Sequence, residues 1–320
     1  MRAIKDEAFL IDDITLQNIT EISKKQSYLE EMRICELSEL ALSAASLAVG
    51  MISDGYGIYE ILSLISDTAP FDNEQLHDEM LYENRERLSA FIKNVRAQDK
   101  AFFAELFIRR VREKGIYVTE RDFLFSHKEK ESFTYVKNPL ADEAYDVFSQ
   151  EFSSPTVSYS KSLQEAVRAV KDGKAEYCLL PLEEKGGARL SAVSELIFRE
   201  DLKINSVIPV FGIEGNADMK YALVAKNFLV PEIDADDDRY LEIRVPRESN
   251  LPISDLFVAA EALGLSLYRV NTISYTTENG ESQHYSVVLR DEKKDFVFLL
   301  TYLTLFSREY TPIGIYKNLE

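Results

Sequence analysis

Six residues near the ends of predicted strands, in the middle of the chain, have side chains suited to acid–base chemistry on an anionic substrate. They are Lys137, Asn138, Glu183, Lys185, Lys220 and Tyr221. The lysine ammonium groups could neutralise carboxylates, and Lys220 or Tyr221 could donate a proton. The simpler alternative is that all six are solvated residues on loops and strand ends, with Glu183 as a hinge residue.

The elements that must position these residues alternate between strand and helix, which is typical of an α/β domain. Runs of β-branched and aromatic residues predict strands at 133–136, 156–159, 176–182, 203–211 and 220–225. Helices are predicted at 141–150 and 191–198, and a capping box of Ser162 and Glu165 predicts another that ends at Gly173. Because few residues separate the last two strands, we expect them to form a hairpin.

A helical segment precedes this α/β segment, and a second mixed segment follows it. Before it, helical periodicity predicts helices at 19–51, 59–66 and 73–111, the last with a break near Asn94. After it, the predicted order is strand 241–245, helix 253–263, strand 266–275, strand 283–289, helix 293–306 and strand 311–316. This βαββαβ order is ferredoxin-like.

The chain is therefore predicted to be a multidomain α+β protein. We expect a helical domain at 1–118, an α/β domain at 130–232 and a ferredoxin-like domain at 239–320. The acidic run at 234–238 repels itself, so it is the most obvious linker.

Charge and apolar patterning narrow the classes of partner. The 320 residues carry a formal charge of -18, which opposes binding to phosphate backbones and anionic lipids, so neither nucleic acid nor membrane is expected as a partner. The N-terminus does not resemble a secretory signal, and the longest apolar stretch, 40–52, is too short to span a bilayer. A cytoplasmic protein is expected.

The metal-ligating and redox-active residue types are sparse. Cys35 and Cys178 have no CxxC partner and are expected to be buried, reduced thiols. The three histidines, His77, His127 and His284, lie far apart in the sequence, so neither a metal site nor a cofactor is expected.

Three segments in the second half of the chain resemble prephenate dehydratases. Residues 166–197, AVRAVKDGKAEYCLLPLEEKGGARLSAVSELI, are similar to the stretch in which that family has a Pro and a Glu, here Pro181 and Glu183. YVKNPLADEAYDVF upstream is similar to the opening strand, loop and helix, and KYALVAKNF downstream to the strand that carries the family's Thr-Arg-Phe. The last segment resembles the ACT domain that follows in that family, with PIGIYKNL at its end.

The resemblance implies the conversion of prephenate to phenylpyruvate, carbon dioxide and water. Such a site must bind two carboxylates and protonate the departing hydroxyl. The resemblance makes Lys220, Tyr221 and Glu183 the candidates for catalysis. Lys137, Asn138 and Lys185 become the candidates for substrate binding.

The departures from the family are as informative as the matches. The family's catalytic threonine falls on Lys220, and its loop of two glycines and a hydroxyl residue is replaced by residues 137–140, which contain neither. The family also places a second α/β lobe before the Thr-Arg-Phe strand, and here only the residues between 211 and 220 are available for it. Each loss disfavours catalysis.

The C-terminal and N-terminal segments carry further expectations from the resemblance. ACT domains commonly pair with a second copy, so a homodimer through 239–320 is expected. The loop at 250–255 lacks the glycine with which the family holds phenylalanine, which leaves Asn271, Thr272 and Ser274 as the candidate ligand contacts. Residues 82–86, YENRE, faintly resemble helical chorismate mutases.

Three functions remain open from the sequence. The favoured one is a regulatory protein of the phenylalanine biosynthesis branch, with lost or reduced catalysis and a dimeric ACT-like domain, whose ligand would be prephenate or an aromatic amino acid. The second is an active prephenate dehydratase, alone or together with chorismate mutase activity. The third is an oligomerising module that binds no small molecule.

Overall fold

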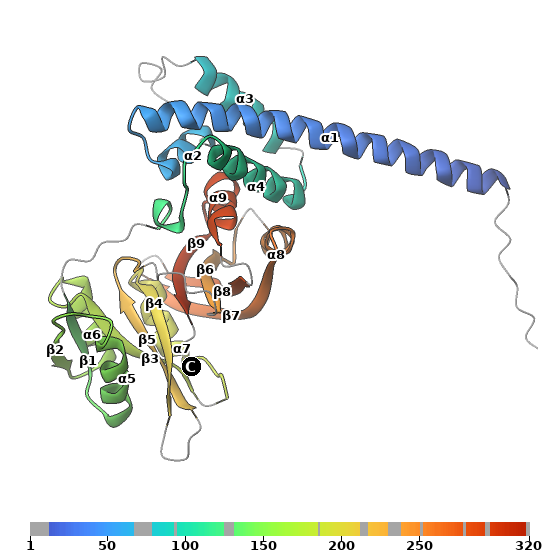
Figure 1. Cartoon of the computed structure of the whole chain (residues 1–320). Helices are drawn as coiled ribbons and strands as arrows, with labels where there is room; N and C mark the ends of the chain where they lie inside the picture. The colour runs from blue at the N-terminus through green and yellow to red at the C-terminus, as the bar shows by residue number, and fades with distance from the viewer. Residues whose placement is uncertain are drawn as a thin grey trace, which may run out of the picture.

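The computed structural model describes residues 13–66, 79–92, 95–124, 131–184, 186–211, 217–229, 238–249, 252–277, 280–291 and 295–317. In this part of the chain, nine strands form one mixed sheet, and helices cover its faces. A further layer, made of the N-terminal helices, lies next to the half of the sheet that the C-terminal strands form (Figure 1).

The helical layer comprises α1 (Asp13–Ser53), α2 (Ile58–Ser66), α3 (Glu79–Ile92) and α4 (Ala97–Glu113). The predicted break near Asn94 is confirmed, since α3 and α4 are separate helices. The first residues of the predicted helix 73–111 lie outside the described part. The layer follows the predicted helical segment closely, because apolar side chains recur there at helical spacing.

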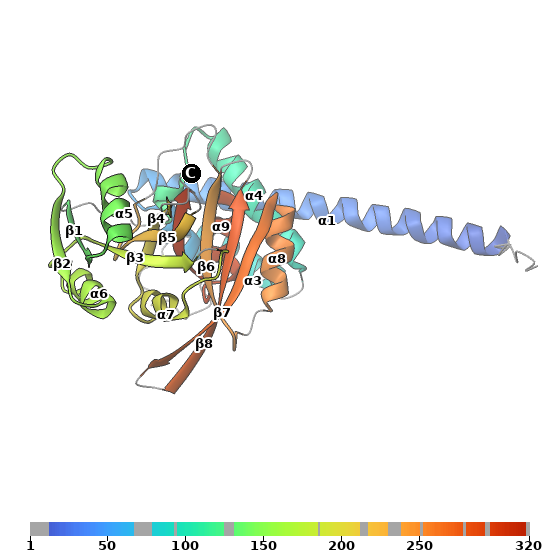
Figure 2. The same ribbon diagram turned by 90° about the horizontal axis from the view of Figure 1, so that it is seen from below.

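The C-terminal half of α1 is buried, and its N-terminal half projects from the body (Figures 1 and 2). This half contacts α4, α3 and α2, and its buried side chains are Leu37, Leu40, Ala41, Ala44, Ala45, Leu47, Ala48 and Met51. The stretch Thr20–Ser53 is long and apolar enough by composition to cross a membrane, with 44% of its most apolar window buried inside the protein. Packing against α4, α3 and α2 accounts for the buried part. Cys35 lies just before the first buried residue of α1, Leu37, and is exposed, so its predicted burial is wrong.

The α/β unit follows the predicted order. It contains β1 (Ser132–Val136), α5 (Pro139–Ser149), β2 (Thr156–Ser160), α6 (Leu163–Lys171), β3 (Tyr177–Glu184), α7 (Ser191–Arg199), β4 (Lys203–Phe211) and β5 (Ala217–Ala225). Ser162 caps α6 by accepting a hydrogen bond from the backbone N–H of Glu165, as its capping box predicts. Strands β4 and β5 pair antiparallel, with Phe211 opposite Ala217, so the predicted hairpin is confirmed and no second lobe separates them.

The C-terminal unit contains β6 (Arg239–Pro246), α8 (Ile253–Ala262), β7 (Leu265–Thr277), β8 (Gly280–Asp291), α9 (Val297–Phe306) and β9 (Thr311–Lys317). Its strands lie in the order β9-β6-β8-β7, which is the ferredoxin-like arrangement that the sequence predicts. One core cluster joins its inner face and helices α8 and α9 to α1, α2 and α4. Helix α7 of the α/β unit packs on the other face, against β7.

The α/β and ferredoxin-like units share a single sheet, with the order β2-β1-β3-β5-β4-β9-β6-β8-β7. The two halves meet where β4 runs parallel to β9, with Ile204 opposite Gly314. A Cβ on residue 314 would lie 3.1 Å from the Ile204 Cβ and 3.0 Å from the Tyr316 ring, so a glycine is needed for this close approach. Strand β9 therefore has neighbours on both sides, and β7 is left as the edge of the C-terminal half.

Candidate functional site

Asn138 and Tyr221 are brought together by the fold, but in structural roles. The Asn138 side chain caps α5, accepting from the Ala141 N–H at 3.0 Å and donating to the Val136 carbonyl at 3.0 Å. The buried Tyr221 hydroxyl donates to the same Asn138 oxygen at 3.3 Å, and burial raises the pKa of Tyr221. The Lys137 ammonium lies 4.7 Å from the centre of the Tyr159 ring. This corner of the α/β unit is therefore held by internal contacts.

Glu183 and Lys220 form the second group, on the opposite face of the sheet from Tyr221. They are paired across β3 and β5, and both line a small hollow with Leu182, Val207, Tyr240, Tyr268 and Tyr316. Consecutive residues of a strand point to opposite faces, so Lys220 and Tyr221 cannot enter one site together. The predicted catalytic residues are thus divided between two places.

The hollow beside Glu183 is small. Its volume is about 20 Å³, which is room for about one water molecule. Arg269 of β7 donates to the Glu183 carboxylate, and its guanidinium lies near Gly187 on the turn that follows β3. A side chain from the ferredoxin-like unit therefore occupies the space that a ligand of Glu183 would need.

A buried ion pair lies next to this hollow. Arg189, on the turn before α7, bonds to Glu242 of β6 at 2.9 Å, and Glu242 is fully buried. Ser286 and Tyr316 donate to the same carboxylate, and Arg189 also donates to Ser194 of α7. Burial opposes the charged form of Arg189, but Glu242 and neighbouring groups outweigh it, so the pKa of Arg189 is raised. This network fastens the α/β unit to the face of the ferredoxin-like sheet.

The remaining predicted residues do not join either group. Lys185 lies outside the described residues. Thr272 and Ser274 are exposed on one face of β7, whereas Asn271 lies on the other face, opposite Ser286 of β8. The Asn271 amide nitrogen is buried without a hydrogen-bond partner. The three candidate ligand contacts therefore do not share one surface.

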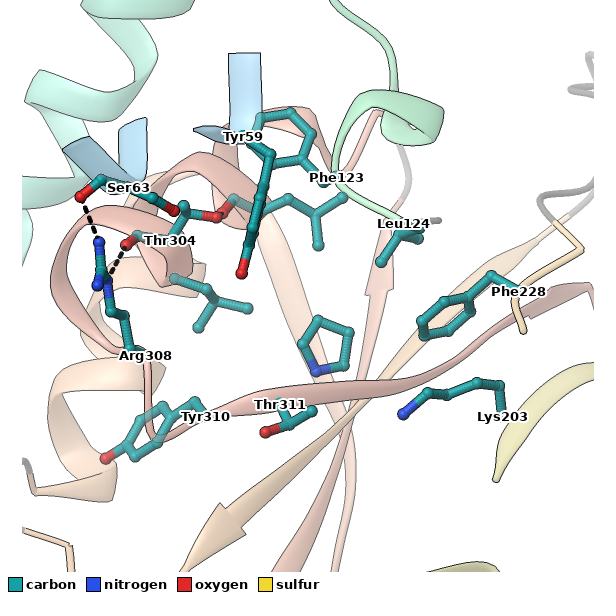
Figure 3. A pocket seen from close by; sticks show the side chains of 13 residues that line it. Tyr59, Ser63, Phe123, Leu124, Lys203, Phe228, Thr304, Arg308, Tyr310 and Thr311 are labelled. Atoms are coloured by element: carbon teal, nitrogen blue, oxygen red, sulfur yellow. Dashed lines mark hydrogen bonds between the residues drawn. The ribbon is translucent and has the colours of Figure 1, made fainter. Parts of the chain in front are cut away.

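A larger cavity lies where the helical layer, the α/β unit and the ferredoxin-like unit meet; we refer to it as the three-way cavity (Figure 3). Its volume is about 300 Å³. The lining residues are Tyr59, Ser63, Phe123, Leu124, Lys203, Phe228, Leu300, Leu303, Thr304, Arg308, Tyr310, Thr311 and Pro312. They come from α2, the segment after η1 (Glu120–Asp122), the start of β4, the segment after β5, α9, the turn after α9 and the start of β9.

None of these lining residues was singled out by the sequence, because they are distant in the chain and carry no motif. Lys203 begins a predicted strand, and Arg308 follows a predicted helix, which are ordinary surface positions. A hollow of about 480 Å³ lies at the end of β6 and the start of β8. It is different in kind, since its polar side chains, such as Arg247 and Gln283, bond to one another.

Comparison with known proteins gives a likeness in solved structures alone. No family profile and no curated protein matches the sequence. The prephenate dehydratase from Streptococcus mutans aligns with a TM-score of 0.47 at 14% identity, over 60% of this chain and 100% of that chain. The prephenate dehydratase from Arthrobacter aurescens, solved with L-Phe, aligns with a TM-score of 0.41 at 13% identity, over 58% of this chain and 89% of that chain. GqqA, described as a novel type of quorum quenching acylase, aligns with a TM-score of 0.41 at 18% identity, over 59% of this chain and 96% of that chain.

Proposed function

We propose that this chain is a prephenate-dehydratase-related regulatory protein of the phenylalanine branch, cytoplasmic, with lost or reduced catalysis. The observation that carries the proposal is the small volume, about 20 Å³, of the hollow beside Glu183 and Lys220. Sites for small molecules usually offer about 300 Å³ or more, and prephenate carries a ring and two carboxylates. Tyr240, Tyr268 and Tyr316 of the ferredoxin-like unit line the hollow, and Arg269 of the same unit bonds to Glu183.

The division of the candidate residues supports the same proposal. A proton donor must lie within hydrogen-bond reach of the group that it protonates. Lys220 and Tyr221 lie on opposite faces of the sheet. The Tyr221 hydroxyl also donates a hydrogen bond to Asn138, which caps α5. No single substrate position could use both groups.

The first prediction concerns turnover. Purified full-length protein incubated with prephenate should form phenylpyruvate no faster than buffer does, followed by its absorbance. The Lys220→Ala variant should give the same trace, because Lys220 has no substrate to protonate. Turnover by the natural chain that disappears in Lys220→Ala would instead support an active dehydratase.

Dimerisation through the ferredoxin-like unit belongs to this proposal. Strand β7 is a 13-residue edge strand, and Leu267, Tyr268 and Val270 on it are exposed. A long apolar edge strand tends to pair with another strand, and a second copy offers the same edge in antiparallel orientation. Because β9 already pairs with β4, the β7 edge is the one that a partner can use.

The second prediction is that the protein is a dimer by light scattering and that Val270→Lys makes it monomeric. A lysine on an edge strand opposes pairing, because two copies would bring like charges together. Glu261→Lys on the exposed side of α8 is the matched control and should leave the dimer intact. A monomeric natural chain, or a dimer that survives Val270→Lys, would contradict pairing through β7.

A further inference from the structure

The three-way cavity has a charge opposite to that of the whole protein. The chain carries a formal charge of -18, yet the thirteen residues that line the cavity include Lys203 and Arg308 and no aspartate or glutamate. In Figure 3, Lys203 and Arg308 lie on opposite sides of the cavity, and the ring of Tyr59 lies between them. A cavity with cations and no anion favours a negatively charged occupant.

Arg308 has a structural role that explains its presence. Its guanidinium donates to the Ser63 carbonyl and the Ser66 hydroxyl of α2, both at 2.6 Å, and to the Thr304 carbonyl of α9. These carbonyls belong to the last turns of two helices, where backbone acceptors lack partners within the helix. Arg308 therefore joins the ends of α2 and α9, and adds positive potential to the cavity.

Lys203 is not explained in this way. Its side chain is 12% exposed, and the ammonium bonds to Asp201 at 3.0 Å. Asp201 also bonds to Arg244 at 3.2 Å, so one carboxylate is shared by two cations and one positive charge is left over. Burial lowers the pKa of Lys203, because the bond to Asp201 offsets only part of the cost of burying its charge. An anion beside Lys203 would supply the missing charge.

The rest of the lining suits an apolar body. Phe228 lies 5.7 Å from the Lys203 ammonium, and Phe123, Leu124, Leu300 and Leu303 provide further apolar surface. A single anionic group bound at Lys203 would thus place an attached ring against aromatic and leucine side chains.

We propose that the three-way cavity binds a small aromatic carboxylate, with its carboxylate at Lys203 and its ring against Phe228. The ligand is a 2-oxo acid or aryl acid in preference to an amino acid, because the lining offers no carboxylate to pair with an α-ammonium group. Since the lining comes from all three parts of the fold, the ligand links them. The proposal gives a ligand class to the regulatory role proposed above, and it rests on that role in this respect only.

The test compares phenylacetate with phenylacetamide, which has nearly the same shape and no charge. At about 5 mM ligand, phenylacetate should raise the Tm of the full-length protein by about 2 °C or more, and phenylacetamide should not. Lys203→Arg should keep the shift, and Lys203→Met should lose it. Lys174→Met, at an exposed lysine of the α/β unit, is the control and should keep it. By titration calorimetry, phenylpyruvate should bind at least about tenfold more tightly than phenylalanine.

Three results would overturn the proposal: no shift with phenylacetate, an equal shift with phenylacetamide, or a shift that persists in Lys203→Met. Binding of phenylalanine as tight as that of phenylpyruvate would overturn the preference for acids without an ammonium group. Prephenate turnover is measured separately, so a failure of the proposed function and a failure of this site are distinguishable.

Discussion

Replacing Arg189 by methionine is expected to lower the free energy of unfolding by about 3–5 kcal/mol, because it leaves a buried carboxylate without its cation. Glu242 is fully buried, and Arg189 is its bonded cation at 2.9 Å. Ser286 and Tyr316 would still donate to Glu242, but neither hydroxyl carries a charge. Urea denaturation measures this loss of unfolding free energy, from the change in the midpoint when the slope of free energy against urea concentration is unchanged.

Two variants make this prediction specific. Arg199→Met on α7 removes an exposed arginine that pairs with Glu195 and Glu200 and should cost less than about 1 kcal/mol. Arg189→Met combined with Glu242→Leu removes both charges and should recover most of the stability. If Arg189→Met alone costs no more than Arg199→Met, the pair does not fasten the α/β unit to the ferredoxin-like sheet.

The elements of the fold were predictable from the sequence because each is encoded locally. Helical spacing gave the helical layer, and the capping box at Ser162 placed the start of α6. The separation between β4 and β5 was short enough to require a hairpin. The βαββαβ order then predicted the strand arrangement of the C-terminal unit.

The joining of the two sheets could not be predicted in the same way. The pairing of β4 with β9 brings Ile204 next to Gly314, which are far apart in the chain. A glycine inside a strand is a sign of close backbone approach, but it does not identify the partner. The homodimer through 239–320 was therefore expected without knowing that β4 occupies one side of this unit's strands.

The sequence placed only some of the candidate residues near one another. Glu183 and Lys220 do meet, since they lie opposite each other on paired strands. The alternation rule alone could have separated Lys220 from Tyr221, and Asn271 from Thr272 and Ser274. Glu242 was missed because Glu242 and Arg244 alternate with Leu241, Ile243 and Val245. Such a pattern predicts a solvated face, and here α7 and the turn before it cover part of that face.

The second large effect is expected at Glu120, where Glu120→Ala should also cost about 3–5 kcal/mol. Glu120 lies in η1, after the helical layer, and forms a buried ion pair with Arg239 at the start of β6. The same carboxylate accepts from the backbone N–H of Phe296 at 3.0 Å, just before α9. The substitution thus leaves a buried guanidinium without its carboxylate and removes the partner of a backbone donor.

Glu120→Gln separates these two effects, because the amide oxygen can still accept from Phe296 while the negative charge is gone. It should destabilise the protein less than Glu120→Ala, and Arg121→Ala, at the exposed neighbour in η1, should change the free energy of unfolding by less than about 0.5 kcal/mol. Equal losses for Glu120→Ala and Arg121→Ala in urea denaturation would contradict the prediction. A large loss confined to the Glu120 variants would mean that the helical layer depends on this buried pair for its attachment to the sheet.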